Sequence, residues 1–135
     1  MQNKLGVVVI GVNGAVSSPL IAGARLMAAG HVPRLGMLTE PGENPAPGEQ
    51  VTDFLSFPKV EELVFGGWDL AFKNVYEAAR HHNVLPAAQL DKIKGELEAM
   101  KPWPAVFSGE YAENCKGENV VTAKDFRGEL DHIIG

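Results

Sequence analysis

Cysteine is almost absent from this sequence, which has one, Cys115, in 135 residues. A single cysteine excludes an intrachain disulfide framework and a zinc site built from several thiolates. The four histidines show no HExxH or Cys/His ligand spacing, so we expect no metal site. Cys115 lies in a polar stretch without a Cys-His motif, which indicates an ordinary thiol rather than a catalytic nucleophile.

Basic charge and long hydrophobic runs are also scarce. The sequence has 12 Lys and Arg against 17 Asp and Glu, a net charge of −5, and no basic stripe of the kind that binds nucleic acid. Its N-terminal apolar run is much shorter than the roughly 20 residues that span a bilayer. The run also lacks the basic region and cleavage site of a signal peptide. We expect a cytoplasmic protein without nucleic-acid or membrane partners.

What the N-terminal part does contain is the pattern of a βαβ unit. Lys4–Ile10 is a valine-rich run typical of a strand buried on both faces of a parallel sheet. A turn at Gly11–Ser18 ends in a Ser-Pro pair, expected as the N-cap and first residue of a helix that Gly30 stops. Arg34–Thr39 predicts a second strand. The chain is therefore expected to be α/β, with a Rossmann-like parallel sheet flanked by helices.

The rest of the chain continues this alternation within one expected domain, residues 1–135. We expect a Pro- and Gly-rich loop at Glu40–Gln50, then a buried strand at Leu63–Phe65 that Gly66-Gly67 ends. Two helical patterns follow, one after Asp69 with an apolar face of Phe72, Val75, Tyr76 and Ala79, and one from Pro86 to Pro102. The remainder is an extended Trp103–Phe107, an irregular Gly109–Asn119 and a last helix, which a capping box at Thr122–Asp125 opens and whose apolar stripe is Phe126, Leu130 and Ile133.

The turn after the first strand is the first candidate site. Backbone N–H groups at a strand–turn–helix junction, helped by the helix dipole, bind anions such as a dinucleotide pyrophosphate. The residues in question are Gly11, Asn13, Gly14, Ala15 and Val16. A G-x-G-x-x-G pattern would need glycine at Asn13 and Val16, although asparagine tolerates a positive φ. The alternative is a tight βα turn with no ligand.

Two further candidates follow expected strands. Asp69 comes after a glycine pair that would let the backbone approach a ligand, and its carboxylate would accept hydrogen bonds from a ribose or an adenine amine. The alternative for Asp69 is the N-cap of the next helix. Thr39 and Glu40 end the second expected strand, where an acidic residue holds the ribose 2′-hydroxyl, or else they form a solvated loop. No catalytic constellation is recognisable.

Several motifs occur together in one order in the middle of the chain. They are VFGGWD at Val64–Asp69, N-x-x-E-A at Asn74–Ala78, the Val84-Leu85 break and P-x-P at Pro102–Pro104. In this combination the sequence resembles the inositol-3-phosphate synthase (myo-inositol-1-phosphate synthase) family. The opening GVVVIGVNGAVSSPLIAGA is similar to the family's cofactor turn, and the resemblance covers nearly all of Lys4–Tyr111.

The resemblance implies a Rossmann domain that binds NAD, in an enzyme that converts glucose 6-phosphate to inositol 3-phosphate by oxidation, aldol cyclisation and reduction. It places Asn13, Gly14, Ala15 and Val16 in the cofactor turn and Asp69 at the nucleotide end of NAD. The chain departs from the family at Asn13, where many members have glycine, and at Ala15-Val16, where many have Asn-Asn.

The resemblance also implies catalytic lysines and phosphate-binding residues in a downstream substrate and tetramerisation domain, to which nothing here corresponds. We therefore assign no catalytic residue and expect the chain alone to be inactive. An incomplete sheet leaves an unpaired edge. We expect that edge, or the last helix, to be covered in a homo-oligomer or by a chain carrying the missing half. The alternatives are a stand-alone nucleotide-binding or regulatory protein and a different NAD-dependent oxidoreductase.

Overall fold

The computed structural model describes residues 4–35, 37, 39–40, 48–107 and 112–134. Their strands form one parallel sheet in the order β1 (Leu5–Ile10), β2 (Leu63–Asp69), β3 (Trp103–Val106) and β4 (Val120–Val121). β1 pairs with β2 from Leu5↔Leu63 to Ile10↔Trp68, whereas β3 pairs only with the last two residues of β2. The expected parallel α/β architecture is confirmed.

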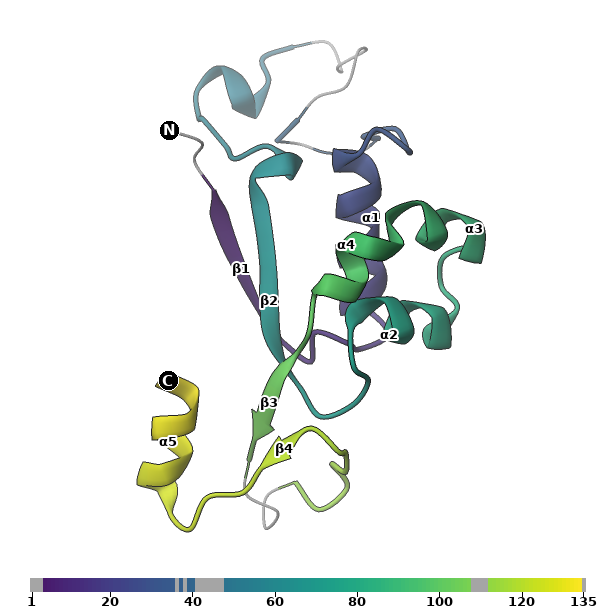
Figure 1. The fold of residues 1–135 in the computed structure, drawn as a ribbon. Coiled ribbons are helices and arrows are strands. Elements are labelled where there is room, and N and C mark those ends of the chain that lie inside the picture. Colours follow the sequence, from purple (N-terminus) through teal and green to yellow (C-terminus); the bar gives the residue numbers. More distant parts are fainter. Residues whose placement is uncertain (1–3, 36, 38, 41–47, 108–111, 135) are drawn as a thin grey trace.

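Helices cover one face of this sheet. α1 (Ser17–Ala28), α2 (Val75–His82), α3 (Ala87–Leu90) and α4 (Lys94–Ala99) gather on that side, and α5 (Phe126–Ile134) lies on the other, beside β3 (Figure 1). Single 3₁₀ turns precede β2 and join α3 to α4, at Val51–Asp53, Val60–Glu62 and Asp91–Ile93.

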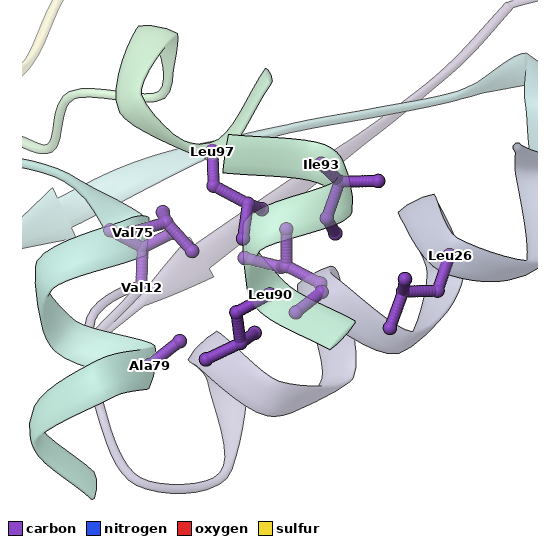
Figure 2. Packing of buried hydrophobic residues seen from close by; sticks show 9 residues of the cluster. Val12, Leu26, Val75, Ala79, Leu90, Ile93 and Leu97 are labelled. Carbon is purple, nitrogen blue, oxygen red and sulfur yellow. The ribbon is translucent and has the colours of Figure 1, made fainter. Parts of the chain in front are cut away.

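The hydrophobic core lies among these four helices and against the sheet (Figure 2). α1 contributes Ile21 and Leu26, and the segments after β2 contribute the facing residues; the whole cluster is Val12, Ile21, Ala22, Leu26, Val75, Ala79, Leu90, Ile93 and Leu97. Val9 and Phe65 pack against it from the strands. Each fully buried leucine or isoleucine contributes about 1.5–3 kcal/mol, so this layer supplies much of the folding free energy.

The opposite face of β1 is open. Val8 is 61% exposed and Ile10 is 89% exposed, although Val9 between them packs on the core. The expectation that Lys4–Ile10 is buried on both faces is therefore wrong for the described residues, because no helix among them covers the outer side of β1. That side is bare apolar surface.

Helix α1 begins at Ser17, two residues earlier than expected, and ends as expected. Ser18 is buried inside the first turn, where its hydroxyl donates to the Gly14 carbonyl at 2.9 Å, so it is not the N-cap. At the other end Gly30 has φ +70°, and the N–H groups of Gly30 and His31 donate to Met27 and Leu26. This pairing is a Schellman motif, which requires a positive φ at the glycine.

The second strand predicted at Arg34–Thr39 is wrong for its described residues, none of which lies in a strand; Gly36 and Leu38 lie outside them. Side chains hold this segment instead. The Arg34 guanidinium bonds the carboxylates of Glu40 and Glu61, and the Glu40 carboxylate accepts from the N–H of Val60. These bonds fix the segment at the amino end of β2. The Glu40–Gln50 loop is largely outside the described residues.

Several other boundaries differ from expectation. Phe72 is not helical, because α2 begins at Val75 with Asn74 as its cap, whose Oδ1 accepts from the Glu77 N–H at 2.9 Å. The single helix expected between the two prolines is broken into α3, a 3₁₀ turn and α4. In α5 the cap is Asp125, which accepts from Gly128 N–H at 2.8 Å. The first residue of its stripe, Phe126, is 73% exposed.

Candidate functional site

The carboxyl ends of β1 and β2 meet at the turn predicted to bind a cofactor. The N–H groups of Gly11 and Val12 donate to the Trp68 carbonyl at 2.8 and 3.2 Å. Parallel α/β sheets bind ligands just beyond the carboxyl ends of their strands. The topology therefore places this turn where a nucleotide is expected.

The turn is shaped by its two glycines. Gly11 has φ +84°, a conformation that side chains rarely adopt, and its carbonyl accepts from the Gly14 N–H at 3.0 Å. A Cβ on Gly14 would lie 3.1 Å from that carbonyl oxygen. Asn13 does not have a positive φ, so the expectation that it replaces a glycine by adopting one is wrong. Gly11 takes that conformation.

The first turn of α1 presents free backbone donors. Within the described residues, no hydrogen bond is formed by the N–H groups of Ala15, Val16 and Ser17. No side chain caps the helix, and its first turn holds no acidic residue. Uncapped N–H groups and the positive end of the helix dipole favour a bound anion, the property that a pyrophosphate site requires.

Asp69 ties this turn to the loop after β2. Its Oδ2 accepts from the Asn13 N–H at 2.8 Å, and its Oδ1 accepts from the N–H groups of Leu70 and Ala71 at 2.8 and 3.1 Å. Because Asn74 caps α2, Asp69 is not an N-cap. An ionised carboxylate has about four acceptor positions, so Oδ2 can also accept from a ligand.

The glycine pair before Trp68 makes room for protein rather than for a ligand. A Cβ on Gly66 would lie 3.3 Å from the ring of Trp103, and one on Gly67 would lie 1.8 Å from the Val9 carbonyl oxygen. The two tryptophan rings then meet edge to face with centroids 4.7 Å apart. β2 consequently runs through both glycines instead of ending before them.

A largely apolar cavity of about 400 Å³ opens in front of the turn. Its walls include Ile10, Gly11 and Trp68 from the strand ends, Asp69, and Ile133 from α5. Cys115 also lines it, although no sequence pattern linked this residue to the turn. Sequence reasoning also missed Asn119, whose side-chain amide donates to the Asp69 carbonyl at 2.8 Å, since it ends a polar stretch without a motif.

The structure does not bring Thr39 to this site. Its neighbour Glu40 accepts a hydrogen bond from Val60, in the 3₁₀ turn before β2, whereas the turn after β1 bonds Trp68 near the other end of the same strand. Consecutive Cα atoms are about 3.8 Å apart, so Thr39, like Glu40, lies near the amino end of β2 and away from the turn. Gly11, Asn13, Gly14, Ala15, Val16 and Asp69 are brought together.

A metal-binding cluster and a membrane-spanning helix were both looked for in the part of the chain that the structure describes. No group of three or more His, Cys, Asp or Glu side chains there is arranged to hold a metal ion. No helix among the same residues is long and apolar enough to cross a membrane.

Comparison with known proteins assigns the chain to a family. Residues 5–133 match an NAD-binding family model described as myo-inositol-1-phosphate synthase. The chain belongs to this family. The resemblance read from the sequence is thus confirmed, and NAD is the cofactor of the matched domain.

Individual relatives agree with this assignment. Inositol-3-phosphate synthase 1 of Bacteroides thetaiotaomicron is 34% identical over 123 residues, which are 89% of this chain and 29% of that protein. Inositol-3-phosphate synthase isozyme 2 of Arabidopsis thaliana is 25% identical over 97% of this chain and 29% of its own length. The chain therefore spans less than a third of these relatives and corresponds to their NAD-binding region.

A solved structure shares the fold. The crystal structure of inositol-3-phosphate synthase from Caenorhabditis elegans matches with a TM-score of 0.73 and 20% identity. The match covers 98% of this chain and 30% of that one.

Proposed function

We propose that this chain is the NAD-binding part of an inositol-3-phosphate synthase that converts glucose 6-phosphate to inositol 3-phosphate. The observation that carries the proposal is the uncapped turn between β1 and α1, which lies against Asp69 at the carboxyl ends of two parallel strands. When bound, the nicotinamide ring supplies a hydride acceptor that is reduced and reoxidised within one turnover. No observation favours a stand-alone regulatory protein.

Each part of the site has a role in this proposal. The N–H groups of Ala15, Val16 and Ser17 bind the pyrophosphate. Asp69 fixes the turn through the Asn13 N–H and accepts a further hydrogen bond from the nucleotide end of NAD. The apolar cavity excludes water from a ring system placed beside the turn. Thr39 has no role in this arrangement.

The groups that act on the sugar phosphate belong, in this proposal, to the part of the relatives that the chain does not match. The described residues contain the cofactor turn but no recognisable acid–base or nucleophilic constellation around it. We expect the 135-residue chain to form no inositol phosphate from glucose 6-phosphate and NAD. Product formation by the purified chain would contradict this expectation.

The single cysteine allows NAD binding to be measured at the site itself. Cys115 is exposed and lines the cavity next to Gly11 and Asp69. We expect saturating NAD to slow its reaction with a thiol reagent several-fold, and calorimetry to show binding of NAD and of ADP. Asp69→Ala should weaken NAD binding about tenfold, since it removes charge-assisted hydrogen bonds that hold the turn.

Two matched variants make this test specific. Asp69→Asn keeps the shape of the side chain but loses its charge, and Asp53→Ala removes an exposed carboxylate from a 3₁₀ turn outside the site. We expect the first to weaken binding and the second to leave it unchanged, with both folded by circular dichroism. If NAD gives neither a calorimetric signal nor protection of Cys115, the proposal is rejected.

Association with further protein remains a prediction. The outer face of β1 carries exposed Val8 and Ile10, and the partly exposed Trp103 extends this surface along the sheet. Contiguous apolar surface of this kind usually forms an interface. We expect light scattering to show species larger than a monomer, and a monodisperse monomer would count against it.

A further inference from the structure

Asn13 is held in place from three directions. Its backbone N–H donates to Asp69, and its side-chain amide donates to the carbonyls of Ala71 at 2.8 Å and Phe72 at 3.3 Å. Its own carbonyl lies 2.9 Å from Nε2 of His82. The residue is only 1% exposed. The turn is therefore locked to the loop after β2 and to the end of α2.

His82 is the last residue of α2 and approaches the turn from the helix side. A backbone carbonyl can only accept, so Nε2 carries the proton in this contact. The imidazole also meets the ring of Phe72 edge to face, with centroids 5.7 Å apart. Phe72 has φ +62°, a strained conformation for a bulky residue, which the amide of Asn13 helps to hold.

The contact with His82 fixes one particular peptide unit. The carbonyl of Asn13 accepts a hydrogen bond from His82. The N–H of Gly14, on the other side of the same peptide unit, donates to the Gly11 carbonyl at 3.0 Å. Both polar groups of this unit are thus engaged, and the unit cannot rotate without breaking a hydrogen bond. The next N–H groups along the chain, those of Ala15, Val16 and Ser17, are the free donors.

We propose that His82 is a positioning residue for NAD, holding the Asn13 carbonyl so that the following N–H groups face the cofactor's phosphates. The proposal rests on the proposed function of the turn as the pyrophosphate site. Donors that are oriented before the ligand arrives need no rearrangement on binding, which raises affinity. His82 itself does not touch NAD in this arrangement, and its effect passes through Asn13.

The first test compares NAD affinity in three variants. His82→Ala should weaken binding about five- to tenfold, the effect of one ordinary hydrogen bond. His82→Gln places an amide donor near the position of Nε2 and should restore affinity to within about twofold. His81→Ala is the matched control, because His81 also packs on the Phe72 ring, at 5.0 Å between centroids, but lies outside the contact with Asn13. It should bind as the unaltered protein does.

The second test needs no cofactor. Hydrogen exchange of the Asn13 and Gly14 amides, followed by NMR, should be faster in His82→Ala than in the unaltered protein and unchanged in His81→Ala. If the unaltered protein fails to bind NAD, the proposed function is rejected, while the exchange rates still decide whether His82 holds the turn. Unaltered NAD affinity in His82→Ala, no rescue by His82→Gln, or unchanged exchange at both amides would each overturn the role of His82.

Discussion

The two faces of the sheet share the same strands but differ in what covers them. On β1, Val9 packs against the helical cluster, whereas Val8 beside it is 61% exposed. Neighbouring side chains of a strand point to opposite faces, so two identical residues can have opposite environments. An unbroken apolar run therefore identifies a strand but does not determine how many of its faces are covered.

We expect the largest loss of stability from a substitution that forces the backbones of β1 and β2 apart. Gly67→Ala would place a Cβ 1.8 Å from the backbone oxygen of Val9, so we expect a loss of about 3 kcal/mol or more in the free energy of unfolding. Gly66→Ala meets the movable ring of Trp103 at 3.3 Å and should cost less than about 1 kcal/mol. Urea unfolding followed by circular dichroism measures both, and equal losses would contradict the comparison.

A smaller effect separates the faces directly. Val9→Ala removes methyl groups that pack on the core and should cost about 1 kcal/mol, because the residue is partly buried. Val8→Ala removes the same groups from exposed surface and should change the stability by no more than about 0.5 kcal/mol. A loss at Val8 as large as that at Val9 would show that the outer face is covered in solution.

The smallest effect concerns the ion pair between Arg34 and Glu61. The hydrogen bond from Arg34 lowers the pKa of the Glu61 carboxyl below its ordinary value of 4.5. A depressed pKa contributes stability above the unfolded-state value, and the contribution is lost as pH falls through the folded-state value. We expect Glu61→Gln to have a slightly lower Tm than the unaltered protein at pH 7.

The difference in Tm should shrink as the pH is lowered below 4.5, because the unaltered carboxyl then becomes protonated as well. Glu113→Gln, at an exposed position, is the control and should show no difference in this range. A difference in Tm that widened in acid would contradict a stabilising role for the ionised Glu61 carboxylate. The Glu61 side chain is more than one-third exposed, so its ion pair with Arg34 contributes little to the free energy of unfolding.

Much of the fold follows from local signals in the sequence. The valine run of β1, the stop of α1 at Gly30 and the extended Trp103–Val106 were all predictable, because each depends on periodicity or on the conformational limits of glycine and proline. The family was recognisable from the GGWD motif and its neighbours. The two-residue strand β4 was not predictable, since it is too short to show a pattern.

The candidate site was predictable in its position but not in its bonding. Gly11 and Asp69 come from motifs, yet the contact of Asp69 with Asn13 joins residues far apart in the chain. The same holds for His82, whose neighbours in sequence indicate only a helix end. The error at Arg34–Thr39 has a related cause, because bonds from Arg34 to the nearby Glu40 and the distant Glu61, rather than local strand propensity, hold that segment.

The short pairing between β2 and β3 has a mechanical consequence. These strands share only the register Trp68↔Trp103 and Asp69↔Pro104, whereas β1 and β2 are joined along six residue pairs. A pulling force applied to the C-terminus would therefore separate β3 from β2 before it separated β2 from β1. Asn119 reinforces the pairing of β2 with β3, because its side-chain amide donates to the carbonyls of Asp69 and Trp103. The strands β3 and β4 are thus joined to the rest of the sheet by a short pairing that lies beside the turn between β1 and α1.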